Sequence, residues 1–528
     1  MTIWLVSREY AGIAEAGGVK NVACSLSENL VKLGHRVILF IPLYGCTDKS
    51  RISKFNCAWH KPVQFCVGEK LQTVTFSHGF LNGVEVVFVC AKPFSEKLGV
   101  YTYTKAEELK NSEFKKGSGH KDSLFLNTLF QKAVIAYGDT CLHEEAPQII
   151  HCQDATTALI PSFLAYKMSI SQESKSFYEK TKCVVTVHNA GPFYHHEFQN
   201  IKDAQYFTGL PLEMLEKGLL NNTVEPFLLA LENSKLTTVS PEYANEIMNG
   251  TVDTAGLTEA FAERGATITG ITNGIDLERY DPCDTTKSLL PASFNPSKKD
   301  FYGKYECRRI FLELCASLKN TNASEDDTVE QYGYLSPFDT TDCTYIAYHG
   351  RVVYQKGIDV LVKAAHSLLE KKLPVKFIFI GQGQPDLEKE LLKLSLSFEG
   401  RCVFFRGYDR MLSRLCIASS DFVVLPSYFE PCGLEDFIAQ IYGTLPVAHA
   451  TGGLCKIIDD ETGFLYSPNK SEKLEEALYS LVKIKSSAGG TIFNNMISYA
   501  AKYVKENYSW EKVALKYEEL YKEILQNL

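Results

Sequence analysis

Apolar residues along this chain follow two patterns: short continuous runs, and longer segments with helical spacing. Thr2 to Val6 and Val37 to Pro42 are continuous apolar runs, which are typical of strands buried on both faces of a sheet. Between them, apolar residues recur every three or four positions from Val19 to Leu33, and Gly34 follows as a helix C-cap. With the Gly17-Gly18 loop before the helix, the order strand, loop, helix, strand predicts a βαβ unit of a parallel sheet.

The same alternation continues through the first half of the chain. Helices are expected at Ser123 to Tyr137 and Val224 to Glu232, and segment 249–265 fits either a mobile loop or short helices. Residues 283–343 are polar and weakly periodic, so we expect an irregular insertion there, at a domain boundary. Further strands are predicted at Val84 to Cys90, Gln148 to Cys152, Cys183 to Val187, Lys235 to Val239 and Ile268 to Ile271.

After this insertion the strand and helix patterns alternate strictly again, which predicts a second parallel sheet. The predicted elements are strands at 345–348, 375–380, 402–406, 421–425 and 445–448, with helices such as 357–372 and 386–398 between them. The expected fold is therefore α/β, with two facing, doubly wound, Rossmann-like domains and ligands beyond the carboxyl ends of the strands, in an interdomain cleft. We place the N-terminal domain at 1–270, the C-terminal domain at 271–505 and a final helix at 506–528.

Composition and charge exclude several classes of protein. The 528 residues are 45% apolar and 22% charged, which excludes disordered, collagen-like and coiled-coil chains. The net charge of −8 argues against a general nucleic-acid-binding surface. No run of about 18 apolar residues predicts a membrane helix, and the first apolar run is too short for a signal peptide, so we expect a cytoplasmic protein without a membrane partner. The 16 cysteines form no C-x-x-C pair and are expected to be reduced thiols.

The strongest candidates for chemistry lie in two loops of the second half. Arg351 and Lys356 flank a loop between a strand and a helix, where two cations suit a diphosphate, although two solvated surface charges explain the pattern equally well. Glu430 lies in a loop shaped by Pro431 and Gly433 after an apolar strand. Its carboxylate could accept hydrogen bonds from sugar hydroxyls, or simply favour the start of a helix.

Other candidates carry weaker signals when taken singly. The small-residue loops at Gly17-Gly18 and Thr451-Gly452-Gly453 could hold a phosphate through backbone N–H groups, whereas a tight turn is the plainer explanation of paired glycines. Tyr408 could stack on a base, and His188 with Asn189 ends a predicted strand. His195-His196-Glu197 is not predicted to bind a metal, because adjacent histidines point in different directions.

In order, these segments together resemble the bacterial glycogen and plant starch synthases, the retaining glucosyltransferases of glycosyltransferase family 5. Pro426 to Leu454 is the most specific stretch of the resemblance. The matching residues are Gly17-Gly18-Val19, His188-Asn189 after Val185-Thr186-Val187, Val239-Ser240-Pro241, Asn273-Gly274-Ile275-Asp276, Gly350-Arg351, Gln355-Lys356-Gly357, Gly407-Tyr408, Phe429-Glu430-Pro431-Cys432-Gly433-Leu434, Tyr442-Gly443-Thr444, Thr451-Gly452-Gly453-Leu454 and Tyr508-Ser509-Trp510.

The resemblance implies the GT-B fold and the transfer of glucose from ADP-glucose to the non-reducing end of an α-1,4-glucan, with retention and without a metal or another cofactor. It implies that Arg351 and Lys356 neutralise the leaving diphosphate and that Glu430 holds glucose hydroxyls. Asp122 matches a functional aspartate of the family, and the last helix is expected to pack on the first domain. The remaining implied contacts are Cys432, Gly433 and Leu434 near the sugar, Tyr408 by the adenine, and Thr451, Gly452 and Gly453 along the phosphates, with Gly17, Gly18, His188 and Asn189 on the N-terminal domain.

Two positions depart from the family pattern. Glu15 stands where the family has a lysine, and Thr156 stands where it has a histidine. A threonine hydroxyl can hydrogen-bond a sugar but does not titrate near neutral pH. If the protein is an enzyme, Glu15 is expected to turn away from the diphosphate or to pair with a cation such as Lys20. These departures keep two alternatives open: a related transferase with another nucleotide sugar, and a glucan-binding or regulatory homologue that has lost turnover.

Overall fold

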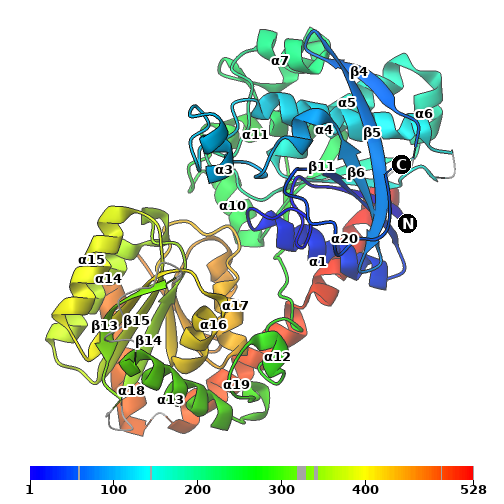
Figure 1. The fold of residues 1–528 in the computed structure, drawn as a ribbon. Helices are drawn as coiled ribbons and strands as arrows, with labels where there is room; N and C mark the ends of the chain where they lie inside the picture. The colour runs from blue at the N-terminus through cyan, green and yellow to red at the C-terminus, as the bar shows by residue number, and fades with distance from the viewer. Residues whose placement is uncertain (58–59, 143–144, 318–328, 338–342, 489, 527–528) are drawn as a thin grey trace. The chain divides into compact units, whose positions relative to one another are not determined.

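The computed structural model describes residues 1–57, 60–142, 145–317, 329–337, 343–488 and 490–526. The chain divides into two compact units (Figure 1). Unit 1 comprises Met1–Asn273 together with Trp510–Leu528, and unit 2 comprises Gly274–Ser509. These limits differ by three and four residues from the predicted ones at 270/271 and 505/506.

The sheet of unit 1 has a parallel centre and an antiparallel edge. Its strands lie in the order β12–β11–β8–β7–β1–β2–β6–β5–β3, with β4 paired to β5. From β12 to β6 all neighbours are parallel, whereas β5 is antiparallel to β6 and β3. The strands are β1 (Thr2–Val6), β2 (Arg36–Pro42), β3 (Ser53–Asn56), β4 (Val63–Val67), β5 (Lys70–Leu81), β6 (Val84–Cys90), β7 (Ile149–Gln153), β8 (Lys182–Val187), β11 (Ser234–Thr238) and β12 (Ile268–Gly270).

Helices cover both faces of this sheet (Figure 1). The glycine loop leads into α1 (Val19–Lys32), which buries Val22, Leu26 and Leu30 at helical spacing. The other helices of eight or more residues are α4 (Ser123–Tyr137), α5 (Ile160–Ile170), α7 (Ile201–Thr208), α10 (Pro241–Asn249) and α20 (Trp510–Gln526). The shorter ones are α2 (Lys92–Ser95), α3 (Lys105–Lys110), α6 (Gln172–Tyr178), α8 (Leu212–Leu215), α9 (Pro226–Ala230) and α11 (Leu257–Glu263).

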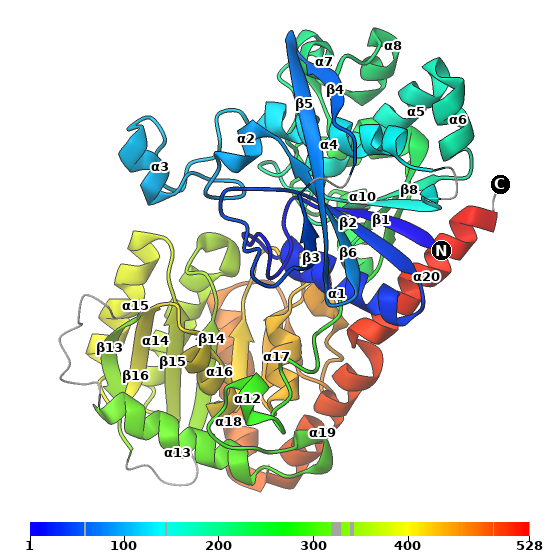
Figure 2. The same ribbon diagram turned by 45° about the vertical axis from the view of Figure 1, so that its right-hand side comes forward.

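The last helix, α20, belongs to unit 1 and packs beside α1 (Figure 2). Its Glu518 carboxylate lies 3.1 Å from His35 Nε2, just after α1. The Tyr521 hydroxyl lies 2.7 Å from Nδ1 of His151, a fully buried residue of β7. The C-terminal segment therefore completes the core of the unit that the N-terminus begins.

Unit 2 is a second α/β layer structure around a seven-stranded sheet. The order is β13–β16–β15–β14–β17–β18–β19, parallel throughout except for the edge strand β13. The strands are β13 (Val329–Leu335), β14 (Thr344–His349), β15 (Val375–Gly381), β16 (Arg401–Gly407), β17 (Phe422–Leu425), β18 (Leu445–His449) and β19 (Phe464–Tyr466). The helices are α12 (Thr285–Ser288), α13 (Tyr302–Ser317), α14 (Ile358–Glu370), α15 (Pro385–Ser397), α16 (Arg410–Ser419), α17 (Glu435–Ile441), α18 (Ser471–Ala488) and α19 (Gly490–Asn507).

The prediction of an irregular insertion at 283–343 is wrong for two of its described segments, whereas 289–301 is largely irregular. Segment 302–317 forms the helix α13, and 329–335 forms the edge strand β13. The helix was missed because its buried face includes Cys307, Phe311 and the cation Lys304. Lys304 Nζ donates hydrogen bonds to the carbonyls of Ala418 (2.8 Å) and Ser420 (2.7 Å), which offset the cost of burying its charge. Residues 318–328 and 338–342 of that prediction lie outside the described residues.

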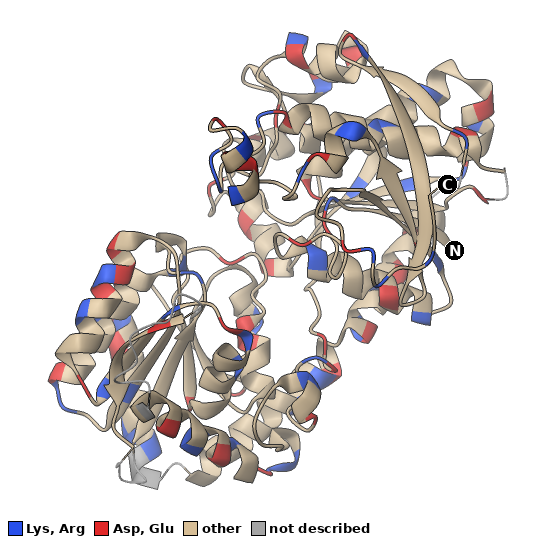
Figure 3. Cartoon of the chain, viewed as in Figure 1, with Lys and Arg blue, Asp and Glu red and all other residues tan. Residues whose placement is uncertain are grey.

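Acidic and basic residues are interspersed along the helices of each unit (Figure 3). No helix in the described ranges is both long and apolar enough to span a bilayer. All 16 cysteines are free thiols.

Candidate functional site

The switch point of the unit 2 sheet lies between β14 and β17. The chain runs from β14 outward to β15 and β16, then returns to β17 and runs outward on the other side. At such a reversal the loops after the two central strands diverge and leave room for a ligand. The loop after β14 carries Arg351 and Lys356, and the loop after β17 carries Glu430.

Lys356 and Glu430 form an ion pair across this switch point. Their side chains are 22% and 16% exposed, so the pair is partly withdrawn from water. Ser427 Oγ also donates to the Glu430 carboxylate, at 3.1 Å. The two loops touch directly: Gly357 has a φ of +66°, and a Cβ there would lie 1.8 Å from the Pro426 carbonyl oxygen. The approach of these loops therefore fixes a cation beside a carboxylate.

The other predicted residues of unit 2 occupy the edge formed by neighbouring strand ends. Arg351 is exposed, and its guanidinium lies 3.3 Å from Gln355 Oε1 on the same loop. The loop Thr451-Gly452-Gly453 follows β18, next to β17, and its Gly453 N–H donates to the Glu430 carbonyl at 2.8 Å. Tyr408, 56% exposed, follows β16 and is separated from β14 by β15. The structure thus gathers the Arg351, Glu430 and Thr451 loops and leaves Tyr408 at a distance of two strands.

The switch point of unit 1 lies between β1 and β7, and buried charges that the sequence reasoning missed follow β1. Arg8 is 2% exposed and donates to the Tyr44 hydroxyl at 2.8 Å and to the Val100 carbonyl at 3.0 Å. Glu9 is 1% exposed. The available signal was two adjacent charges, Arg8 and Glu9, one serine after a largely apolar strand, because charged side chains are rarely buried without polar partners.

Glu9 occupies the anion position of the glycine loop. Its carboxylate accepts the Ala16 N–H at 3.1 Å and also the Gly17 N–H. Burial raises the pKa of Glu9, while the backbone hydrogen bonds oppose that rise. Gly18 is exposed and has open space around its Cβ position. The Glu9 carboxylate therefore accepts the Gly17 N–H in this structure.

Glu15 pairs with Lys20, as expected for a carboxylate at this position. The Lys20 Nζ lies 2.9 Å from Glu15 Oε2, and the Gly12 N–H donates to Glu15 Oε1 at 2.8 Å. The charge reversal at position 15 is thus balanced locally by a cation in the first turn of α1.

His188 and Asn189 lie at the carboxyl end of β8, beside the end of β7. His188 Nε2 lies 2.8 Å from Gln153 Oε1, and the His188 N–H donates to Asp154 Oδ1 at 3.3 Å. Burial lowers the pKa of His188 to about 4 and raises that of Asp154 to about 7, so His188 is neutral at neutral pH. Thr156 is only 4% exposed.

Asp122 lies at the N-cap of α4, and its carboxylate is 2.7 Å from Lys97 Nζ. The Asp122 side chain is 40% exposed, so it faces solvent on one side while its charge is neutralised on the other. Asp122 is thus partly open to solvent at the start of α4, whereas Arg8 and Glu9 are buried.

The described residues include one group with metal-ligand chemistry, formed by His195, Glu197 and Glu225. His195 Nε2 lies 2.9 Å from the Ala190 carbonyl oxygen, and Nδ1 lies 3.3 Å from the buried Glu225. Burial lowers the pKa of His195, but the hydrogen bond and charge of Glu225 outweigh it and leave the pKa raised. His195 therefore faces the Glu225 carboxylate, and His196 is not part of the group.

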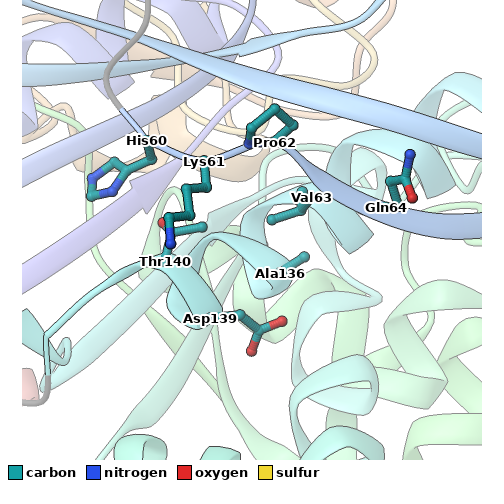
Figure 4. Close-up of a pocket in the computed structure, with 8 residues that line it drawn as sticks. All are labelled: His60, Lys61, Pro62, Val63, Gln64, Ala136, Asp139 and Thr140. Carbon is teal, nitrogen blue, oxygen red and sulfur yellow. The ribbon is translucent and has the colours of Figure 1, made fainter.

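A hollow of about 690 Å³ lies at the far end of α4, away from Asp122 (Figure 4). Because α4 starts at the carboxyl edge of the sheet and ends near Tyr137, this hollow belongs to the opposite edge. None of the predicted site residues lines it. The lining residues are His60, Lys61, Pro62, Val63, Gln64, Ala136, Asp139 and Thr140.

Comparison with known proteins agrees with the two doubly wound units. Residues 2–263 match the family model described as the starch synthase catalytic domain, and residues 339–504 match the model of glycosyl transferases group 1. The catalytic domain of starch synthase IV from Arabidopsis thaliana, solved with ADP and acarbose, superposes with a TM-score of 0.77 at 23% identity, over 99% of each chain. Fold and site together define a glycosyltransferase of the GT-B type.

Curated relatives define the family. Glycogen synthase from Thermodesulfovibrio yellowstonii is 30% identical over 99% of this chain and 98% of its own length. Glycogen synthase from Vibrio vulnificus is 26% identical over 100% of this chain and 99% of its own. The chain belongs to the glycogen and starch synthase family, glycosyltransferase family 5.

Proposed function

We propose that this enzyme transfers glucose from ADP-glucose to the non-reducing end of an α-1,4-glucan such as glycogen, with retention of configuration, in the cytoplasm. The observation that carries the proposal is the Lys356–Glu430 ion pair at the switch point of unit 2. A nucleotide sugar presents a diphosphate next to a neutral, hydroxyl-rich ring, and this pair presents a cation next to a hydrogen-bond acceptor. The relatives named glycogen synthase and the neighbour solved with ADP support the choice of donor and acceptor.

In unit 2 the proposed roles follow from charge and position. Arg351 and Lys356 stabilise the diphosphate as its negative charge grows during bond cleavage. Glu430 accepts hydrogen bonds from glucose hydroxyls, and its contact with the Ser427 hydroxyl supports this role because the carboxylate accepts a hydroxyl donor there. Backbone groups of Gly433 and Leu434, beside Cys432, contact the sugar, while Thr451, Gly452 and Gly453 line the phosphates and Tyr408 lies by the adenine. Side-chain cations take the part that a divalent metal plays in other transferases.

Unit 1 is proposed to serve the acceptor side. Asp122, His188 and Asn189, together with the exposed Gly18, offer hydrogen bonds to sugar hydroxyls at the carboxyl edge of the sheet. His188 is neutral, so it acts there as a hydrogen-bonding group rather than as a cation.

A second candidate is a glucan-binding homologue with little or no turnover. Two observations favour it: the Glu9 carboxylate accepts the Gly17 N–H of the glycine loop, and Thr156 is buried. One experiment separates the candidates: purified protein is incubated with glycogen and labelled ADP-, UDP- or GDP-glucose. We expect incorporation from ADP-glucose. Glycogen binding without incorporation from any donor supports the second candidate instead, and incorporation from another donor alone overturns the donor assignment.

A further inference from the structure

Lys456 is a buried cation beneath the two loops that are proposed to contact the donor. Its Nζ donates to the carbonyl oxygens of Cys432 (2.6 Å), Gly433 (3.0 Å) and Gly453 (3.0 Å). It also lies 2.9 Å from Asp436 Oδ1, and the two side chains are 6% and 0% exposed. A buried ammonium group costs stability unless it is paired and hydrogen-bonded. Lys456 is paired with Asp436 and hydrogen-bonded to three backbone carbonyls, so both conditions are met.

The loops that Lys456 joins come from different strands. Cys432 and Gly433 follow β17, whereas Gly453 follows β18. A Cβ at Gly453 would lie 2.1 Å from the Cys432 carbonyl oxygen, so only glycine permits this approach. Three carbonyl oxygens of these loops surround one ammonium group, whose positive charge offsets their mutual repulsion.

The hydrogen bonds from Lys456 to the Cys432 and Gly433 carbonyls also determine where the N–H groups of the same two peptides point. In a trans peptide the N–H points away from the C=O of the preceding residue. Lys456 binds the carbonyls of Cys432 and Gly433, so the N–H groups of Gly433 and Leu434 point away from it. Among the described residues these two N–H groups have no acceptor. A carbonyl that binds a cation polarises its peptide and makes the attached N–H a stronger donor.

We propose that Lys456 is a positioning residue of the donor site, which holds the Gly433 and Leu434 N–H groups outward and strengthens them as donors to oxygen atoms of the transferred glucose. This inference rests on the proposed function. Asp436 offsets the charge of the ammonium group, so Lys456 acts through the peptides and does not contact the ligand itself.

A purely structural role for Lys456 makes a different prediction, and a matched lysine separates the two. Lys376 is also buried, at 2% exposure, and also donates to a backbone carbonyl, that of Ser336. It lies in β15 near its N-terminal end, at the opposite edge of the sheet from the donor loops. Removing either ammonium group should cost stability, but only Lys456 is expected to change catalysis.

The experiment compares wild type with Lys456→Met, Lys456→Gln and Lys376→Met, using labelled ADP-glucose and glycogen. Folded protein is quantified by circular dichroism and thermal melting, and the dissociation constant for ADP is measured alongside kcat and KM. For Lys456→Met we expect kcat per folded enzyme to fall at least about tenfold, because oriented backbone donors contribute on that scale. ADP affinity should change less than about threefold, since the polarised N–H groups serve the sugar and not the nucleotide.

Lys376→Met should keep the wild-type kcat per folded enzyme. Lys456→Gln retains a hydrogen-bond donor but no charge, and its kcat is expected to be at least about fivefold below that of wild type. This variant tests the inference if Lys456→Met does not fold. Equal kcat values in the Lys456 variants and Lys376→Met overturn the inference while leaving the proposed function intact. Wild-type protein that binds ADP but transfers glucose from no donor overturns the proposed function and this inference with it.

Discussion

Replacing Lys356 by alanine tests the role of the ion pair at the switch point. The change removes a cation that is 22% exposed and paired with Glu430. The Lys356 cation and a phosphate charge about 4 Å from it would attract each other by roughly 4 kcal/mol at the effective dielectric constant of a partly exposed site. Loss of one preorganised contact to a developing charge typically costs about 10²- to 10³-fold in rate, or about 2.7–4 kcal/mol. Both routes predict that kcat/KM for ADP-glucose falls by two to three decades.

The coupling between the two side chains sharpens this prediction. In Lys356→Ala the Glu430 carboxylate loses its cation and faces the diphosphate alone, which adds repulsion to the lost attraction. Adding Glu430→Gln should therefore cost less in the Lys356→Ala background than in wild type, with a coupling of at least about 1 kcal/mol in the double-mutant cycle.

The assay is the initial rate of label transfer to glycogen over a range of donor concentrations, with circular dichroism to establish folding. Lys363→Ala is the matched control, because Lys363 is an exposed lysine of the adjoining helix α14. It should stay within about twofold of wild type. A folded Lys356→Ala enzyme with kcat/KM within threefold of wild type would refute the reasoning.

Three further predictions follow from other contacts. Lys20→Ala should raise the KM for the donor and Glu15→Lys should leave it unchanged or lower it, because Lys20 is the cation that balances the Glu15 carboxylate. Steady-state kinetics test this, and an unaltered KM in Lys20→Ala together with lost donor binding in Glu15→Lys would contradict it. Treatment with EDTA should leave turnover largely intact, because side-chain cations are proposed to replace the metal, and loss of activity that Mg²⁺ or Mn²⁺ restores would contradict it. Asp421→Asn should lower the free energy of unfolding by about 3–5 kcal/mol at pH 7, because it leaves Arg308 (2.7 Å) and Lys485 (2.6 Å) without the carboxylate, only 15% exposed, that pairs with both. Burial raises the pKa of Asp421, but those two cations outweigh it and hold the pKa below its usual value. In urea denaturation the difference in unfolding free energy between wild type and Asp421→Asn should therefore persist above about pH 4 and shrink as the pH falls below it. A difference independent of pH would count against the pairing.

The alternation of strands and helices could be predicted because parallel strands buried on both faces are continuous apolar runs. Segment 84–90 is a strand and 123–137 a helix with the predicted bounds. The antiparallel edge β3–β5 was missed because β3 is mostly exposed and the first residues of β5 are exposed and mostly polar. Helix α13 was missed because its core-facing positions include cysteines and the buried cation Lys304, whose neighbours become visible only in the folded chain.

The candidate site was predictable where a loop motif follows a strong strand. Such motifs place Lys356 and Glu430 after β14 and β17, but their contact depends on strand order, which one sequence does not state. Lys456 was overlooked because nothing in its spacing marks it, and Glu9 was overlooked although two charges follow the first apolar strand. Their importance arises from burial against backbone N–H and carbonyl groups of distant loops, and a sequence pattern does not record such contacts.

The measurement that tests the central claim most directly follows one labelled glucose. ADP-[¹⁴C]glucose is incubated with the purified protein and glycogen, and the polymer is then digested from its non-reducing ends by an exo-acting α-1,4-glucanase that releases maltose. Transfer to non-reducing ends predicts that label enters the polymer and leaves early in the digestion as labelled maltose. Label recovered only as free glucose, or retained in polymer that resists this digestion, would contradict the account.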